Sequence, residues 1–190
     1  MTIRKPRIKP AAGRLLISEP ALYDFYFSRS VVLLANHNEK EGSLGLILNK
    51  PINLKLNEVV QEFPTNEFPL FLGGPVHPER LFFLHTLGEK IMGSIEILDG
   101  LFWGGQIDKL MELIDLHLVQ PHQVKFFIGY SGWDPGQLDR ELRENSWIVS
   151  QCTKDLVMND TPEKLWGAIL KELGSDYAIW ANYPPDPILN

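Results

Sequence analysis

The sequence predicts an α+β protein built on a mixed β-sheet. Strand-like segments outnumber helical ones, and the two kinds do not alternate regularly, as they would in a doubly wound α/β fold. The hydrophobic fraction is 44% and the aromatic fraction 11%, which is enough to build a core. The 190 residues suit one domain, since domains usually have roughly 100–200 residues. We expect this domain to span residues 13–190, behind a flexible basic tail at residues 1–12.

The predicted strands are short segments that are apolar or alternate between apolar and polar residues. They are rich in Val, Ile and Phe and are bounded by Gly, Asn or Pro, which is typical of strands. In chain order they are Arg14–Ile17, Val31–Ala35, Leu44–Leu48, Leu70–Leu72, Leu81–His85, Gly93–Leu98, Val124–Tyr130 and Trp147–Ser150.

Two amphipathic helices are indicated by apolar residues at helical spacing. The first carries its apolar face on Ile107, Leu110, Met111, Ile114 and Leu118. In the second, Thr161 is the expected N-cap and Pro162 the first helical residue. Its apolar stripe consists of Leu165, Trp166, Ile169, Leu170 and Leu173, and Gly174 suits its C-terminal cap.

A third helix should follow the strand Val124–Tyr130, and a short one should cover Asn57–Glu62. Asp134 can cap the third helix, Pro135 is the expected first helical residue, and Gln137 can reach back as the capping-box partner. At the carboxyl end, Tyr183–Asn190 is too rich in proline for a helix or a central strand. We expect it to run along the surface as an extended tail.

The charge of the chain is divided unevenly. The formal net charge is −6, and the first twelve residues carry +4 on Arg4, Lys5, Arg7 and Lys9, so the other 178 residues carry −10. DNA binding depends on neutralising phosphates with Lys and Arg, so an acidic domain argues against direct DNA binding. The tail alone could contact a polyanion, and a solvated terminus is the preferred interpretation of it.

Several classes of protein are excluded or disfavoured by composition. The longest apolar runs have five or six residues, which is too short to span a membrane, and the basic start is not followed by the apolar stretch of a secretory signal. One cysteine, Cys152, excludes an intramolecular disulfide, and it lacks a CxxC partner, so we interpret it as a buried, inert thiol. These features predict a soluble, cytoplasmic protein.

The segment Gly129-Tyr-Ser-Gly-Trp133 was compared with the nucleophile elbow G-x-S-x-G of hydrolases. The predicted strand–turn–helix context is present, but Trp133 replaces the second glycine and its bulk would obstruct the sharp turn. We therefore favour a tight turn in which Gly132 permits an unusual backbone angle, and keep Ser131 as a weaker candidate nucleophile.

Other polar or glycine-bearing residues lie at predicted strand ends. Gly73-Gly74 could let the backbone approach a ligand or another part of the chain, and the structural turn is preferred. Asn49 could bond the local backbone, and Lys50 could offer a positive charge, although a turn with a solvated lysine is the preferred interpretation. No pair of histidines has the spacing of a helical metal site, so we predict neither a metal nor a cofactor.

Taken together, these runs resemble the AlgH/YqgE family of uncharacterised bacterial proteins. The resemblance covers about residues 13–180, and its residues are Gly13–Pro20, Asp24, Phe27–Arg29 with Val31-Val32, His37, Gly42–Pro51, Gly73–Val76, Leu84-His85, Gly129–Trp133, Gly136–Leu138 and Trp147. It implies a bent sheet that forms a pseudo-barrel with helices outside. The family name implies a transcriptional regulator of alginate synthesis, and no agreed catalytic residue comes with it. The family also accepts alanine where Ser131 stands, which weakens the serine hypothesis.

Three functional hypotheses remain. The favoured one is a non-enzymatic protein that binds a small ligand or a protein partner, with an indirect regulatory role. Its pocket would draw on residues at strand ends and turns, namely Asn49, Lys50, Gly73, Gly74, His85, Tyr130, Gly132 and Gln137. The alternative is a hydrolase that uses His85 or His37 as base with Ser131 or water. A third possibility is a regulator that contacts DNA through the basic tail.

Overall fold

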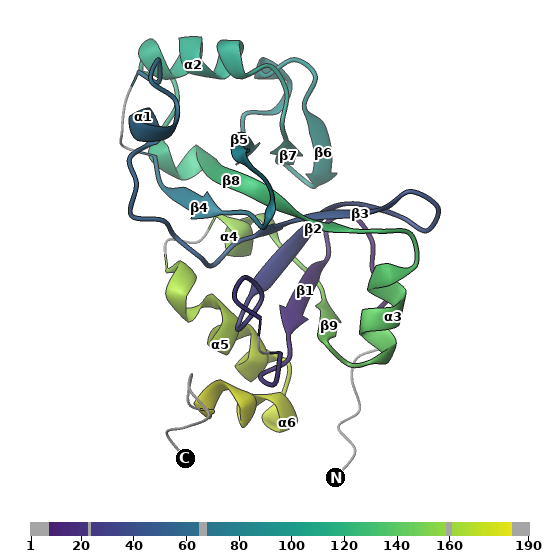
Figure 1. Cartoon of the computed structure of the whole chain (residues 1–190). Helices are drawn as coiled ribbons and strands as arrows, with labels where there is room; N and C mark the ends of the chain where they lie inside the picture. Colours follow the sequence, from purple (N-terminus) through teal and green to yellow (C-terminus); the bar gives the residue numbers. More distant parts are fainter. Residues whose placement is uncertain (1–7, 23, 65–67, 159–160, 184–190) are drawn as a thin grey trace.

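The computed structural model describes residues 8–22, 24–64, 68–158 and 161–183 of the chain (Figure 1). Its strands are β1 (Leu15–Ser18), β2 (Val31–Asn38), β3 (Gly42–Ile47), β4 (Leu70–Leu72), β5 (Val76–His85), β6 (Ile95–Leu98), β7 (Leu101–Trp103), β8 (Val124–Trp133) and β9 (Trp147–Ser150). Its helices are α1 (Leu56–Val59), α2 (Ile107–Asp115), α3 (Gln137–Arg143), α4 (Lys154–Val157), α5 (Pro162–Glu172) and α6 (Ser175–Ala178). Short 3₁₀ turns cover Gly88–Lys90, Pro121–Gln123 and Trp180–Asn182.

The strands form one sheet in the order β6-β7-β5-β8-β3-β2-β1-β9, and β4 pairs with β8 beside this path. All neighbours are antiparallel except β4 and β8, which run parallel, so the predicted α+β class and mixed sheet are confirmed. The sheet bends but does not close into a barrel, because β6 and β9 stand at opposite ends of the strand order. The predicted helices flank it (Figure 1).

Strand β8 carries the bend of the sheet. Its first half, up to Ile128, pairs with β4 and β5, whereas Ser131–Trp133 pairs with β3. Between the two halves Gly129 has a φ of 65°, and a Cβ built there would lie 2.5 Å from the carbonyl oxygen of Gly74. Only glycine fits this conformation and this contact without strain. The bend therefore depends on a residue without a side chain.

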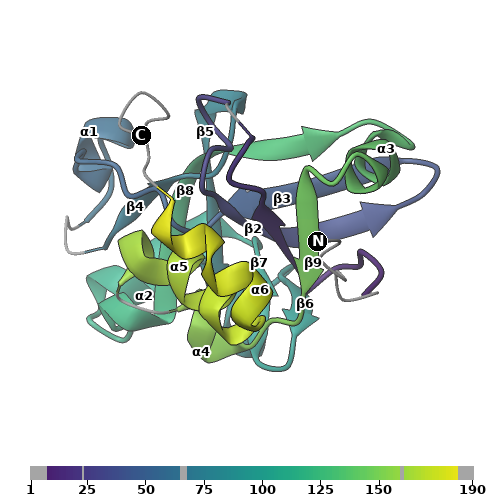
Figure 2. The same cartoon turned by 90° about the horizontal axis from the view of Figure 1, so that it is seen from below.

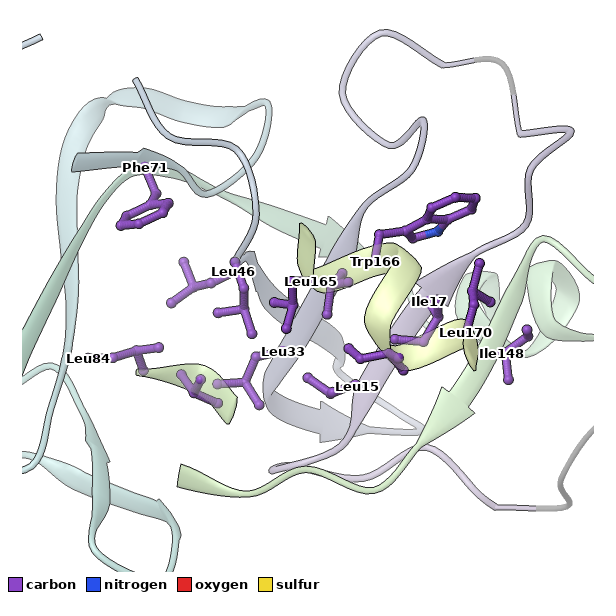
Figure 3. Packing of buried hydrophobic residues seen from close by; sticks show 14 of the residues in the cluster. Leu15, Ile17, Leu33, Leu46, Phe71, Leu84, Ile148, Leu165, Trp166 and Leu170 are labelled. Carbon is purple, nitrogen blue, oxygen red and sulfur yellow. The ribbon is translucent and has the colours of Figure 1, made fainter. Parts of the chain in front are cut away.

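Alternate residues of the central strands supply two apolar layers. Leu15, Ile17 and Leu33 pack with the buried stripe of α5, as Figure 3 shows, while Figure 2 shows α4, α5 and α6 together on this side of the sheet. Leu165, Trp166, Ile169 and Leu170 are all buried, so the predicted apolar face of this helix is confirmed. The intervening residues Leu16, Val32 and Leu34 pack in another cluster with Trp133, Leu138 and Trp147.

Several element bounds differ from the sequence prediction. Strands β4 and β9 have the predicted ends, but β8 continues to Trp133 and α2 ends at Asp115, which leaves Leu118 61% exposed. His117, with a φ of 56°, is incompatible with a continuing helix. Strand β7 was not predicted, although Asp99-Gly100 between Leu98 and Leu101 is a typical two-residue hairpin turn.

The two predicted tails lie largely outside the described residues. Residues 1–7 hold most of the basic tail, and residues 184–190 hold the proline-rich end. The basic tail, the boundary at residue 12 and the extended carboxyl-terminal tail therefore stay predictions. Within the described ranges no helix is long and apolar enough to cross a membrane.

Candidate functional site

A polar cleft of about 420 Å³ opens where three separate segments meet. The β2–β3 hairpin and the continuous segment from the end of β8 to the start of α3 form most of its walls, and Val76 of β5 is the third contributor. The lining residues are Asn36, Glu41, Gly42, Ser43, Leu44, Val76, Tyr130, Gly132, Trp133, Asp134 and Gln137. The predicted site residues Tyr130, Gly132 and Gln137 are brought together here.

The β2–β3 turn is held close to β8 by its own sequence. The Asn38 side-chain oxygen accepts hydrogen bonds from the backbone N–H groups of Lys40 (2.8 Å) and Glu41 (3.3 Å), which shapes the turn. Gly42 follows with a φ of 96°, and a Cβ there would lie 2.2 Å from the carbonyl oxygen of Trp133. The cleft wall therefore forms only because glycine permits this close approach of two backbones.

The floor of the cleft lies between Gly132 and Tyr130. Gly132 is exposed, and a Cβ added to it would meet the Tyr130 ring at 3.3 Å and Val76 at 3.6 Å. The Tyr130 ring stands edge-on to Phe82, with centroids 5.5 Å apart, and lies 6.0 Å from the ring of His77. A side chain at Gly132 would thus occupy part of the cleft, which makes this position a probe of binding.

The far wall is organised by the carboxylate of Glu141. One oxygen accepts a hydrogen bond from the Gln137 side-chain amide, and the other accepts from the indole N–H groups of Trp133 and Trp147, each at 2.8 Å. The Gln137 side-chain oxygen accepts from the backbone N–H of Asp134 at 3.0 Å. Two cleft-lining side chains are therefore held in one orientation by a residue behind them.

The start of α3 corrects the sequence prediction. Gln137 does reach back to Asp134, as predicted for a capping box, but the helix begins at Gln137 and not at Pro135. Gly136, in the left-handed conformation with a φ of 76°, separates the Asp134–Gln137 turn from the helix. The capping contact therefore stabilises a turn ahead of the helix.

Two of the predicted site residues, Asn49 and Lys50, follow β3 and do not line the cleft. The Asn49 amide accepts from the backbone N–H of Val31 and donates to the carbonyl of Arg29, both at 2.8 Å, so it fixes the entry to β2. Burial lowers the pKa of Lys50, and the charge of Asp24 opposes this shift. The Lys50 ammonium lies 3.5 Å from the carbonyl oxygen of Phe25.

Gly73 and Gly74 allow their backbone to lie very close to the backbone of β8. A Cβ on Gly73 would lie 2.2 Å from the carbonyl oxygen of Gly129, and one on Gly74 would lie 2.3 Å from the carbonyl carbon of Tyr130. Both glycines are buried. Ser131 is also buried, and its hydroxyl donates to the carbonyl of Gly73 at 2.9 Å. These contacts favour the structural-turn interpretation, and they occupy the hydroxyl of the candidate nucleophile.

His85 is fully buried at the end of β5. Its Nδ1 accepts from the backbone N–H of Leu87 (3.2 Å), so the proton is assigned to Nε2, which donates to the carbonyl of Gly104 (3.1 Å). Burial lowers its pKa, and the bond to Gly104 acts in the opposite direction. With both nitrogens engaged, the imidazole holds the loop after β5 to the β7 end and does not reach the cleft.

A histidine–serine contact does occur, between residues that sequence reasoning did not join. His37 Nδ1 lies 2.8 Å from the Ser43 hydroxyl oxygen, and the two residues are direct cross-strand partners on β2 and β3. Ser43 lines the cleft. The sequence did contain a signal for this pair. Residues 37 and 43 are placed symmetrically about a short polar turn, so they would face each other if the segment formed a hairpin.

Cys152 was predicted to be buried, but the structure leaves it half-buried. Partial burial still raises the pKa of its thiol to about 12, which favours the inert character that was predicted. Among the residues that the structure describes, no group of three or more His, Cys, Asp or Glu side chains could hold a metal ion. A larger hollow of about 540 Å³ runs along α5, but it contains none of the predicted site residues.

The fold and the cleft define an α+β protein with a bent, open sheet and a polar hollow at the turns of three segments. The chain belongs to the AlgH-like family, whose sequence pattern matches residues 15–178. It is 42% identical over 178 residues to a UPF0301 protein of Chlorobium limicola, covering 94% of this chain and 95% of the relative. It is 45% identical over 186 residues to a UPF0301 protein of Parabacteroides distasonis, covering 96% and 93%.

Two solved structures have a similar fold. The solution structure of the AlgH protein from Pseudomonas aeruginosa matches with a TM-score of 0.74 and 27% identity, over 97% of this chain and 98% of that one. The crystal structure of a protein from Corynebacterium diphtheriae matches with a TM-score of 0.77 and 20% identity, over 94% and 95%. The expected AlgH/YqgE resemblance is therefore confirmed.

Proposed function

We propose that the chain is a non-enzymatic binding protein that accepts a small ligand, or a short segment of a partner protein, in the cleft beside Gly132. The observation that carries the proposal is the convergence of three separate segments on one open polar hollow, with its wall side chains held in place by Glu141. Binding sites are typically concave, largely preformed and lined by a few fixed polar groups. A cytoplasmic location and an indirect regulatory role stay predictions.

Of the eight residues predicted to bind a ligand, the proposal keeps Tyr130, Gly132 and Gln137. The other five are not among the cleft-lining residues. Asn49, Gly73, Gly74 and His85 are engaged in backbone contacts, and Lys50 is half-buried. Asn36, Glu41, Ser43 and Asp134 replace them. The binding hypothesis thus moves to one end of two central strands, at the start of β3 and the end of β8.

The test uses protein purified from its own host under gentle conditions and measured by native mass spectrometry. We expect a co-purifying mass that is lost in Gly132→Val, because the new side chain enters the cleft floor against Tyr130 and Val76. Gly167→Ala is the matched control, since its added Cβ meets only Ala181 at 3.8 Å. Retention of the same bound mass by Gly132→Val would contradict binding in this cleft.

The hydrolase alternative keeps one specific observation in its favour, the 2.8 Å contact between His37 and Ser43. A serine hydroxyl within reach of a histidine nitrogen is the geometry of an activated nucleophile. A fluorophosphonate probe tests it: the Ser43 oxygen would bond to phosphorus, fluoride would leave, and His37 would take the hydroxyl proton. Labelling at Ser43 that disappears in Ser43→Ala and His37→Asn but persists in Ser131→Ala would establish this alternative, and an unlabelled protein would remove it.

A further inference from the structure

We propose that the cleft selects a positively charged group, a guanidinium or a primary ammonium. This inference rests on the proposed binding function and specifies its ligand chemistry. It follows from the charges that line the cleft, from the engagement of two wall donors by Glu141, and from the charge of the domain as a whole.

The charged groups of the cleft are all negative. Glu41 enters from the β2–β3 turn and Asp134 from the turn before α3, so the two carboxylates belong to different walls. Among the described residues that line the cleft, none is Lys, Arg or His. Both acidic residues are exposed, which keeps them available to a ligand arriving from solvent. An anion would meet two like charges on this lining and no cation from it.

Two hydrogen-bond donors of the wall are already occupied. The Trp133 indole donates to Glu141, and one N–H of the Gln137 amide donates to the same carboxylate. The Asn36 amide, the second N–H of Gln137 and the hydroxyls of Ser43 and Tyr130 are the other polar side-chain groups of the lining that can donate. Glu141 therefore removes two donors that an anionic ligand could use, and the charged groups of the lining are the carboxylates of Glu41 and Asp134.

The Tyr130 ring and the net charge of the domain also favour a cation. The Tyr130 ring lines the cleft, and the face of an aromatic ring attracts cations, guanidinium groups in particular. Residues 13–190 carry a net charge of −10, so their field raises the local concentration of cations at the surface. A free amine and the basic side chain of a partner protein share this chemistry, and the choice between them is made by experiment.

The experiment compares three probes of similar size but different charge. Nα-acetylarginine amide is the cation, Nα-acetylcitrulline amide is its neutral isostere, and Nα-acetylglutamate amide is the anion. Binding is followed by the amide shift of Gly132 in ¹H–¹⁵N spectra and by tryptophan fluorescence. We expect the arginine probe to bind several-fold more tightly than the citrulline probe, with an affinity that falls as salt rises.

Charge-removing variants assign the effect to the two carboxylates. Glu41→Gln and Asp134→Asn should each weaken the arginine probe about two- to five-fold, the range for exposed ion pairs, and leave the citrulline probe unchanged. Glu163→Gln, an exposed site on α5, is the control and should change neither. Circular dichroism of each variant verifies that the fold is intact.

A second arm separates the two sources of the cation. N-acetylagmatine presents one guanidinium on a small molecule, and Ac-Gly-Arg-Gly-NH₂ presents the same group on a peptide. Tighter binding of N-acetylagmatine supports a small ligand, and tighter binding of the peptide supports a protein partner. Equal or tighter binding of the citrulline or glutamate probe overturns the cation inference and leaves the binding function standing. If no probe shifts the Gly132 amide, the cation inference is also overturned. The binding function is tested separately, by the loss of the co-purified mass in Gly132→Val.

Discussion

The indole nitrogen of Trp133 donates a 2.8 Å hydrogen bond to Glu141 of α3, and this contact connects the end of the bent strand to the helix that follows it. The same carboxylate oxygen accepts the indole of Trp147 on the edge strand β9. The two indole rings stand edge-on, with centroids 5.9 Å apart, and Phe27 packs against both. One carboxylate thus joins the cleft wall, the helix and the sheet edge.

We first predict that Glu141→Ala destabilises the protein by about 2 kcal/mol or more. The substitution leaves two indole N–H groups and the Gln137 amide without their acceptor, and each unsatisfied buried donor costs about 1–3 kcal/mol. Urea denaturation followed by tryptophan fluorescence measures the loss. Glu144→Ala, at an exposed site beside the same helix, is the control. Equal stability of the two variants would show that the three hydrogen bonds contribute nothing.

Replacing Gly74 by alanine should be far more damaging than replacing Gly167. The new Cβ of Gly74→Ala would lie 2.3 Å from the backbone of Tyr130, where the crossing chain cannot move aside, so we expect a loss above about 3 kcal/mol or no soluble protein. Gly167→Ala, in the middle of α5 with open space around it, should be neutral or stabilising by up to about 1 kcal/mol. Thermal unfolding of both variants measures the difference in stability. A Gly74→Ala protein as stable as the parent would refute the close approach of Gly74 to the Tyr130 backbone.

The buried His85 should make stability depend on pH. Because burial lowers the pKa of His85 in the folded state below its ordinary value of 6.5, the unfolded chain binds the proton more readily. The stabilising contribution of neutral His85 is therefore present above about pH 6.5 and is lost as the pH falls from there toward the folded-state pKa. Urea denaturation between pH 7.5 and 5 should show a steeper decline for the parent than for His85→Gln, which cannot titrate. Parallel slopes would contradict this assignment.

Cys152 should resist alkylation in the folded protein. A pKa raised from 9.0 to about 12 leaves about a thousandfold less thiolate at pH 8, and the thiolate is the reacting species. Mass spectrometry after iodoacetamide treatment should find little modification of the folded chain and rapid modification in urea. Similar rates in the two conditions would mean that the thiol is neither buried nor shifted.

Much of the fold was predictable because local chemistry is strong where the chain is most regular. The stripe Leu165–Leu170 with Pro162 defines α5, and the alternation of apolar residues defines the strands, since these patterns depend only on neighbours along the chain. The correct ends of Leu70–Leu72 and Trp147–Ser150 follow from the turn-forming residues beside them. The prediction was wrong at Leu118, because the helix ends at Asp115 and His117 then adopts a left-handed conformation with a φ of 56°.

The candidate site was predicted only in part, for a physical reason. Tyr130, Gly132 and Gln137 were found because they flank one strand–turn–helix unit, whereas Asn49 and His85 resembled ligand residues until their backbone partners were known. A polar side chain at a strand end has the same sequence signature whether it binds a ligand or satisfies a buried amide. Local sequence cannot distinguish the two, because the partner is brought close by the rest of the fold.

The sequence by itself determined the α+β class, the acidic charge of the domain, the apolar faces of the main helices and the family to which the chain belongs. Only the tertiary structure decided which polar residues share a cleft, that the Ser131 hydroxyl bonds to Gly73 while Ser43 faces His37, and that Glu141 holds the side chains of Trp133 and Gln137. The reason is the distance along the chain over which the interactions act. Helices and strands are set by residues a few positions apart, whereas a site depends on contacts between segments far apart in the chain. Here those contacts are possible because glycines let one backbone cross close to another.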